Sequence, residues 1–223
     1  MGVGTKVNRT DPVLQQDEEQ LRNSGVLNQN TAQGLSVCFF YNCKLFAFRA
    51  NDEHRNLDVS QFSINYDHES GLKYLEFKGR SCKNVQGGLK HKKVETKNIH
   101  HFEQPENKRC VVKVYEKYLS LIPYSGAFYR RPMEGNVLKF SSQVIGEEKL
   151  GGMMKNLFSE AGIDTTGRKI TNHSGIVGCC TFLFNSGFDD QTVRSRSGHR
   201  SSAVELYKRP LKDLQLKCAN GER

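Results

Sequence analysis

The feature that most constrains this chain is the stretch from residue 169 to residue 210, because cap and turn residues divide it into three short helices. Asn172 can cap the first helix, which is largely apolar and ends at Gly187, where a left-handed cap is expected. Asp189 can cap the second helix, and the third ends before Pro210. The sequence therefore predicts a compact helical unit at the end of the chain.

This layout decides where three polar side chains fall. His173 lies at the start of the first helix, and His199 lies in a Ser-Gly-His-Arg turn after the second. Tyr207 follows eight residues later, at the end of a helix that starts at Ser201 or Ser202. We take the two histidines and the tyrosine as the first candidate functional residues, on the condition that folding brings them together.

The same layout resembles the C-terminal half of a tyrosine recombinase catalytic domain. The segments Asn-His-Ser-Gly and Ser-Gly-His-Arg-Ser-Ser-Ala-Val-Glu-Leu-Tyr-Lys are similar to the Crypton branch of that family. Crypton transposons carry such recombinases, and zinc finger MYM-type nuclear proteins carry domesticated relatives. The resemblance covers roughly Asp11 to Pro210. It implies a mixed α+β, mainly helical fold with a small three-stranded antiparallel sheet.

The resemblance also implies a role for each of five residues. Tyr207 would attack the phosphorus of DNA and form a phosphotyrosine, which keeps the bond energy and needs no metal, ATP or other cofactor. Arg49, which precedes a Glu-His-Arg-Asn-Leu segment, would hold the scissile phosphate. Lys83 matches the family's loop lysine and would protonate the leaving 5′ oxygen, while His173 and His199 would handle protons and bind phosphate.

The sequence departs from the family at one position. The family pattern at the first histidine is His-x-x-Arg, and the fourth residue here is Ile176. Loss of one pre-organised donor costs roughly 100 to 1,000-fold in rate, so we expect impaired catalysis. Arg55 is a competitor of Arg49 for the phosphate, with a surface ion pair as its alternative role. Four other arginines could replace the missing one: Arg168, Arg194, Arg196 and Arg200.

The charge of the chain points to an anionic partner. Lys and Arg total 33 against 24 Asp and Glu, which gives a formal net charge of +9. A basic solvated surface would explain this charge equally well, but nucleic acid is the commonest partner of such a domain. With the resemblance, we expect double-stranded DNA as the partner, with a homo-oligomer on DNA as one possible state. The expected DNA contacts are Lys90, Lys92, Lys93, Arg168, Lys169 and Arg200.

Other classes of protein fit the composition poorly. The seven cysteines are odd in number and form no Cys-x-x-Cys pair, so neither a disulfide scaffold nor a standard zinc module is expected, and no metal site is predicted. Apolar runs such as residues 37–41 are too short to span a bilayer, so no membrane partner is expected. We expect a soluble nuclear protein, with the localisation implied by the resemblance and the charge.

The remaining patterns define one domain. Residues 1–10 are expected to form a flexible arm, residues 11–210 the recombinase-like catalytic domain and residues 211–223 a tail. Asp11-Pro12 predicts the first helix start, with Asp11 as its N-cap. Further predicted elements are a helix capped by Thr31, a hairpin at 61–77, a third strand at 92–102, a helix at 111–122, extended pieces at 128–132 and 137–140, and a helix from Gly146 to Gly162.

Three functional hypotheses follow from the sequence. The first is a Crypton-type recombinase domain that binds DNA and performs, or descends from a protein that performed, strand exchange. The second is a domesticated, catalytically inactive domain that binds DNA or chromatin, which Ile176 favours. The third is a protein-interaction module of a nuclear regulator that uses its basic face for an acidic partner.

Overall fold

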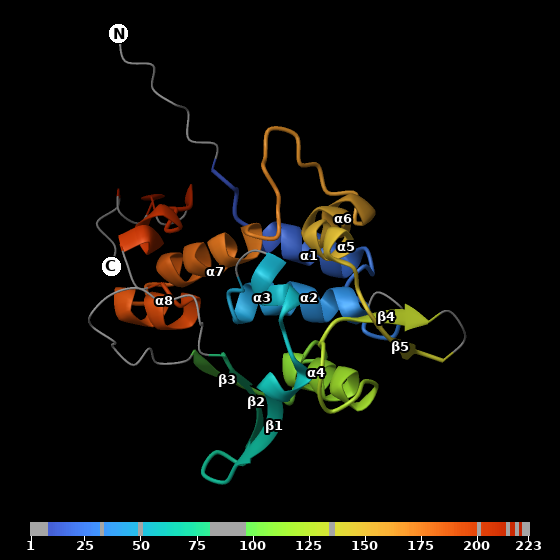
Figure 1. The fold of residues 1–223 in the computed structure, drawn as a ribbon. Helices are drawn as coiled ribbons and strands as arrows, with labels where there is room; N and C mark the ends of the chain where they lie inside the picture. The colour runs from blue at the N-terminus through green and yellow to red at the C-terminus, as the bar shows by residue number, and fades with distance from the viewer. Residues whose placement is uncertain are drawn as a thin grey trace, which may run out of the picture.

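The computed structural model describes residues 9–31, 34–48, 51–80, 97–133, 137–199, 202–212, 215–216 and 219 (Figure 1). These ranges contain eight α-helices, two 3₁₀ helices and two antiparallel sheets, so the predicted mixed α+β class is confirmed. The elements are α1 Gln15–Asn23, α2 Gly34–Leu45, α3 Asn51–Arg55, η1 Val59–Gln61, β1 Phe62–Asp67, β2 Leu72–Lys78, β3 Asn98–Phe102, α4 Val111–Ser120, β4 Arg130–Met133, β5 Lys139–Val144, α5 Glu147–Gly151, α6 Met153–Glu160, α7 Ser174–Asn185, α8 Asp190–Ser197 and η2 Ser202–Leu206.

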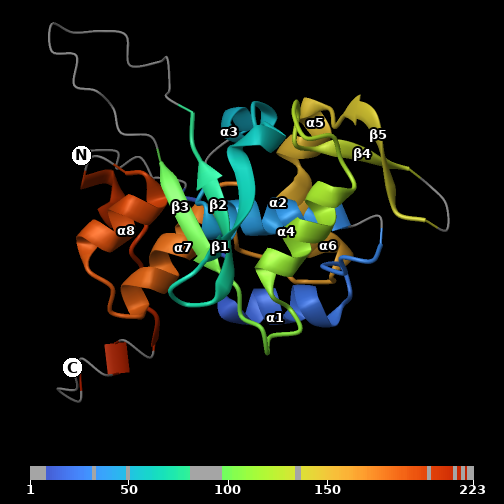
Figure 2. The ribbon, with the colours of Figure 1, turned by 90° about the horizontal axis from the view of Figure 1, so that it is seen from below.

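Helix α2 forms the centre of the helical body, with α7, α4 and α6 packed around it (Figures 1 and 2). Its side chains Phe39, Phe40 and Cys43 are at most 1% exposed, and a helix buried on all sides needs no polar face. Helix α7 approaches α2 very closely at Gly175, where a Cβ atom would lie 2.3 Å from the Cβ of Cys43. The absence of a side chain at Gly175 therefore sets the distance between the two helices.

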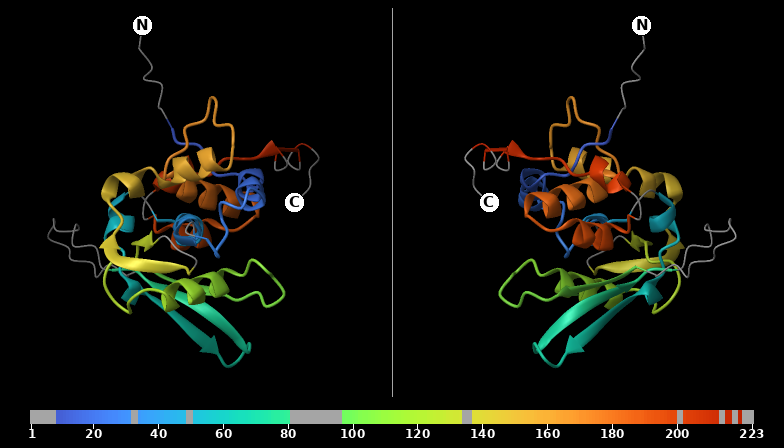
Figure 3. Two further views of the ribbon diagram at one scale, coloured as in Figure 1. Left: turned by 90° about the vertical axis from the view of Figure 1, so that its right-hand side faces the viewer. Right: turned by 90° about the vertical axis from the view of Figure 1, so that its left-hand side faces the viewer.

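The first sheet is three-stranded and antiparallel in the order β1-β2-β3, as predicted. Gly71, with φ +69°, lies in the turn between β1 and β2, and this hairpin projects away from the helical body (Figure 3). The buried side chains of the sheet face the helices, with Phe77 packed 5.3 Å from the ring of Phe46. Strand β3 starts at Asn98, and residues 92–96 of the predicted strand lie outside the described residues.

The second sheet pairs β4 with β5, which confirms the extended pieces predicted around residues 128–132 and 137–140. The single helix predicted from Gly146 to Gly162 is divided into α5 and α6. Gly152 is at once the C-cap of α5 and the N-cap of α6. Glycine has a low helix propensity, and this position is where the chain changes direction. Gly162, with φ +66°, follows the end of α6 as predicted.

The predicted start of the first helix is wrong. Helix α1 begins at Gln15 instead of just after Asp11, and its N-cap is Leu14, whose backbone N–H donates to Asp17 at 2.8 Å. The Asp11 carboxylate instead accepts a hydrogen bond of 2.7 Å from the backbone N–H of Lys169. The carboxylate of Asp11 therefore binds a distant part of the chain, although the local sequence pattern predicted that it would cap a helix.

The predicted cap of α7 is also wrong. His173 is the N-cap residue of α7, and the Asn172 side chain turns toward the preceding helices. Asn172 accepts from the backbone of Met154 at 3.1 Å and donates to the carbonyl of Leu150 at 2.8 Å. This buried amide ties the loop before α7 to α5 and α6, and so fixes where His173 begins the helix.

The core consists of two clusters. The larger one joins α2, α4, α6 and the inner face of the three-stranded sheet. The smaller one joins α7, α8 and η2, and Tyr207 packs at its margin. Ile176 lies in the smaller cluster and is 0% exposed. The smaller cluster thus holds the helices that carry the candidate histidines and tyrosine.

Candidate functional site

Tyr207 lies directly after the 3₁₀ helix η2 and is held against α7 by its backbone. Its N–H donates to the carbonyl of Val204 at 2.9 Å, and its carbonyl accepts from Thr181 Oγ1 at 2.8 Å. Two residues later, Asn185 donates to the carbonyl of Arg209 at 2.8 Å. Two α7 side chains therefore fix the segment around Tyr207 while its side chain stays half-buried.

His173 contacts the tyrosine hydroxyl. Its Nε2 lies 3.1 Å from the Tyr207 oxygen, and the two ring centroids are 5.3 Å apart. Which of the two atoms donates depends on the imidazole tautomer. An imidazole at hydrogen-bond distance from a phenol is the geometry that proton removal from that phenol requires.

His199 packs against the ring of the same tyrosine. Gly198, with φ +70°, ends α8 in the left-handed conformation and turns the chain toward the site. The ring of His199 lies 4.7 Å from the ring of Tyr207, and its Nδ1 lies 2.8 Å from Ser197 Oγ. The three candidate residues of the 169–210 stretch are thus brought together, although their roles stay predictions.

The other predicted catalytic residues, Arg49 and Lys83, lie outside the described residues, as do Lys90, Lys92, Lys93 and Arg200. Among the described residues, Lys97 contacts the segment that directly precedes Arg49. Its ammonium donates to the carbonyl of Phe46 and lies 5.8 Å from the ring centroid of Phe48. Sequence reasoning missed this lysine, because the predicted strand at 92–102 included it, whereas the observed β3 starts one residue later at Asn98.

Ile176, where the sequence resemblance implies an arginine, is an apolar side chain that is 0% exposed. Ile176 packs in the cluster that contains Ala47, Cys180 and Val204. A guanidinium at this point would have to be buried, and burial of a charge without a partner is costly. An uncharged, buried side chain therefore occupies this position in the cluster against which Tyr207 packs.

Two of the candidate replacement arginines are partly engaged. Arg168 forms a bidentate ion pair with Asp17, at 2.9 and 2.6 Å, and this carboxylate raises the pKa of the guanidinium. Arg194 has Nη2 3.9 Å from Glu205, and its buried Nε has no hydrogen-bond partner among the described residues. Neither guanidinium contacts Tyr207 in this arrangement.

Arg196 differs from both. It is half-buried, and desolvation lowers the pKa of its guanidinium. It donates to the carbonyl of His100 at 3.3 Å, and no carboxylate of the described ranges pairs with it. It lines a groove of about 410 Å³ between β3 and α8, two elements that lie side by side in Figure 2. A desolvated cation of this kind suits an anion.

The predicted DNA contacts Arg168 and Lys169 lie in the loop before α7. The Arg168 guanidinium is 24% exposed and is bound by Asp17, whereas the Lys169 side chain is exposed. Their role toward DNA stays a prediction, and Arg168 would have to exchange a carboxylate for a phosphate. In the described part of the chain, no group of three or more His, Cys, Asp or Glu side chains could hold a metal ion. No helix in these ranges is long and apolar enough to cross a membrane.

The fold is similar to that of known recombinase structures. It resembles the crystal structure of XerA recombinase with a TM-score of 0.59 at 15% identity, over 96% of this chain and 66% of that one. It also resembles XerH site-specific recombinase bound to a palindromic difH substrate, with a TM-score of 0.58 at 14% identity, over 94% of this chain and 52% of that one. The predicted tyrosine recombinase catalytic-domain fold is therefore confirmed, and the chain spans two thirds or less of the length of these recombinases.

Residues 13–159 match the family described as "Domain of unknown function (DUF3504)". The match covers more than half of the chain, so the chain belongs to this family. It includes the positions of Arg49 and Lys83 and ends before His173. No curated protein matches the chain.

Proposed function

We propose that this chain is a DNA-binding, tyrosine recombinase-like domain of Crypton type, whose strand exchange proceeds through a phosphotyrosine and is impaired at Ile176. The observation that carries the proposal is the 3.1 Å contact between His173 Nε2 and the Tyr207 hydroxyl, with His199 packed on the same ring. The recombinase fold and the net charge of +9 support DNA as the substrate.

The proposed reaction assigns each step to a residue of this chain. His173 accepts the phenolic proton while the Tyr207 oxygen attacks phosphorus, so the O–P bond forms as the bond to the 5′ oxygen breaks. Lys83 gives a proton to the departing 5′ oxygen, and Arg49 and His199 hold the non-bridging oxygens. Attack by the released hydroxyl on the phosphotyrosine reverses these steps and rejoins DNA without an external energy source.

Covalent trapping tests the chemistry. The protein is incubated with a nicked suicide duplex, and a protein–DNA adduct is sought on a denaturing gel. We expect a weak adduct in the unaltered protein and none in Tyr207→Phe, which keeps the ring and loses the nucleophile. An adduct that persists in Tyr207→Phe would remove Tyr207 from its assigned role.

A second candidate function is a catalytically inactive DNA-binding or chromatin-binding module. The observation that favours it is the complete burial of Ile176 in an apolar cluster. This candidate expects duplex binding with steep salt dependence and no adduct. Binding that is absent or insensitive to salt would instead favour the protein-interaction module with an acidic partner.

The relation to zinc finger MYM-type proteins, nuclear localisation and a homo-oligomer on DNA are parts of the same proposal. They rest on the sequence resemblance and the positive charge. Imaging of the tagged chain, with and without neutral replacements at Lys90, Lys92 and Lys93, tests the localisation. Sedimentation with duplexes that carry one or two binding sites tests the oligomer.

A further inference from the structure

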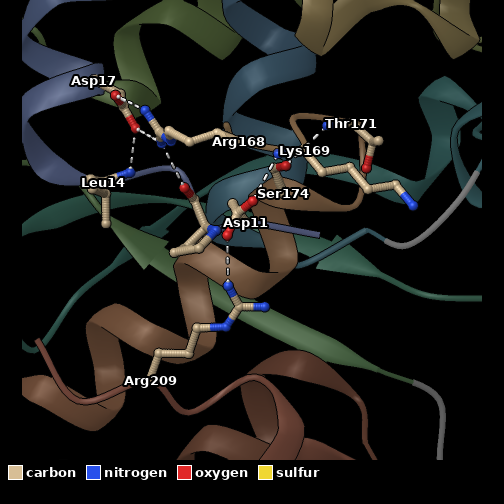
Figure 4. Close-up of polar contacts among 9 residues, drawn as sticks. Asp11, Leu14, Asp17, Arg168, Lys169, Thr171, Ser174 and Arg209 are labelled. Atoms are coloured by element: carbon tan, nitrogen blue, oxygen red, sulfur yellow. Dashed lines mark hydrogen bonds and ion pairs between the residues drawn. The ribbon is translucent and has the colours of Figure 1, made fainter. Parts of the chain in front are cut away.

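Residues 10–14, which we call the N-terminal strap, lead to α1, and Asp11 of the strap lies between Lys169 and Arg209 (Figure 4). The strap was predicted to be the first turn of a helix, but its backbone makes tertiary hydrogen bonds instead. Asp11 N–H donates to the carbonyl of Lys169 at 3.0 Å, and Val13 N–H donates to the carbonyl of Ser174 at 3.2 Å. Ser174 directly follows His173.

Asp11 joins two segments that are far apart in the sequence. One carboxylate oxygen accepts from the backbone N–H of Lys169 at 2.7 Å, and the other lies 3.2 Å from Arg209 Nη1. Arg209 also donates to the carbonyl of Thr10. Because Arg209 is two residues after Tyr207, a single aspartate connects the loop before His173 with the segment that carries the tyrosine.

A second anchor keeps the strap from sliding. Arg168 donates to the carbonyl of Pro12 at 3.1 Å while its guanidinium pairs with Asp17. Asp17 is 3% exposed, so this ion pair is screened little by water. Between the two anchors the strap lies directly on α7, where a Cβ on Gly178 would come 2.7 Å from the carbonyl oxygen of Val13.

We propose that the N-terminal strap is a positioning element for Tyr207, and that Asp11 acts through Arg209 to keep the tyrosine hydroxyl beside His173. The catalytic consequence rests on the proposed function, but the positioning itself does not. The opposite reading is that Arg209 binds a DNA phosphate and that Asp11 only neutralises it in the absence of DNA. The two readings make opposite predictions for Asp11→Asn, which keeps the shape of the side chain and removes its charge.

Amide hydrogen exchange followed by mass spectrometry tests the positioning without any need for catalysis. In Asp11→Asn and in Arg209→Gln, we expect exchange in peptides spanning residues 204–211 to accelerate about fivefold, because the segment opens more often. The reversed pair, Asp11→Arg with Arg209→Asp, should slow the exchange only in part, because it restores the ion pair but not the bonds to the Lys169 N–H and the Thr10 carbonyl. The matched control is Arg22→Gln, which breaks the ion pair with Glu18 on α1 and should leave these peptides unchanged.

The outcomes separate the two proposals. Unchanged exchange at residues 204–211 in both single variants overturns the strap proposal, whether or not the protein forms an adduct. Faster exchange in the two single variants supports the strap proposal even if the unaltered protein forms no adduct. In that case the missing adduct counts only against the proposed recombinase chemistry.

If the adduct forms, Asp11→Asn should slow its formation severalfold with duplex affinity unchanged. Tighter duplex binding by Asp11→Asn, at an unchanged rate of adduct formation, would instead identify Arg209 as a phosphate contact and overturn the proposal.

Discussion

Within the described residues, His54 and His173 each lie at hydrogen-bond distance from a tyrosine hydroxyl, and the two pairs differ in their surroundings. His54 Nδ1 lies 2.8 Å from the Tyr129 hydroxyl, and His173 Nε2 lies 3.1 Å from that of Tyr207. The first pair is fully buried between α2, α3 and β4, and burial lowers the pKa of His54 to about 3 and raises that of Tyr129 well above its ordinary value. The second pair is half-buried at the margin of the smaller core.

The difference teaches that the contact distance alone does not define a catalytic pair. The Tyr129 hydroxyl also accepts from Asn42 at 2.6 Å, and His54 Nε2 lies 3.3 Å from Cys43 Sγ, so every polar group is satisfied inside the protein. Such a network holds elements together and offers nothing to a substrate. The pair at Tyr207 has the same contact but keeps access to solvent, which a DNA strand needs.

The largest expected effect comes from Ile176, which packs in the cluster beside the His173–Tyr207 pair. Ile176→Arg should raise the rate of adduct formation about 100 to 1,000-fold, because it supplies the missing phosphate donor. It should also lower the free energy of unfolding by about 3 kcal/mol, since the new charge is buried until DNA binds. Suicide-duplex kinetics and urea unfolding measure the two effects.

The control for this variant is Ile176→Gln, which has a similar burial penalty and no cation. A folded Ile176→Arg protein that gains no activity would show that the site lacks more than one arginine.

The buried pair should respond in stability only. Tyr129→Phe removes the hydroxyl shared by Asn42 and His54, so the free energy of unfolding should fall by about 1 to 3 kcal/mol. Salt-dependent DNA binding should persist below the melting temperature. The control is Tyr124→Phe, because Tyr124 is 95% exposed. Loss of binding in a folded Tyr129→Phe protein would mean that the two pairs are coupled.

The pH dependence of stability distinguishes the pairs further. His54 stays neutral in the folded protein down to a pKa of about 3, whereas the unfolded chain takes up a proton near pH 6.5. The unfolded state therefore binds more protons between these values, and His54 alone should lower the free energy of unfolding by about 1.4 kcal/mol per pH unit as the pH drops below 6.

Urea titrations between pH 4 and 7 should show this slope, and His54→Gln should reduce it. His101, whose pKa is lowered to about 4 mainly by burial, adds to the slope in the same direction. His101→Gln should therefore reduce the slope as well. A slope unchanged in both variants would contradict the assignment.

The smallest expected effect concerns Arg196 in the groove between β3 and α8. Arg196→Gln should weaken duplex binding by about three- to tenfold. In a plot of the logarithm of the binding constant against the logarithm of the salt concentration, the slope should become shallower by about one. Arg22→Gln, whose guanidinium is paired with Glu18, should leave both unchanged. Equal effects of the two variants would indicate a general loss of charge.

Local signals made part of the fold predictable from the sequence. Gly187 has φ +79°, and Asp189 caps α8 by accepting from Thr192 N–H at 2.9 Å, both as predicted. Alternation of polar and apolar residues predicted β1 and β2 correctly. These features depend on neighbours within a few residues, so a single sequence specifies them.

The rest depended on partners that are distant in the chain. Asp11 bonds to Lys169 and Arg209, which are 158 and 198 residues away, and His54 bonds to Tyr129, 75 residues away. A helix-cap signal at Asp11 was overridden because packing offered its carboxylate better donors. The meeting of His173 and Tyr207 was expected from the family resemblance and not from the pattern of residues alone.

The close approach of α7 to α2 at Gly175 determines which substitutions the fold can accept. Replacement of Tyr207 would end any chemistry but leave the architecture, whereas any side chain at Gly175 would force α7 away from Cys43. In a saturation library selected only for folding, position 207 should accept many residues and position 175 almost none. Selection for strand exchange would make both positions intolerant, so comparison of the two selections separates the requirement of the fold at position 175 from that of the chemistry at position 207.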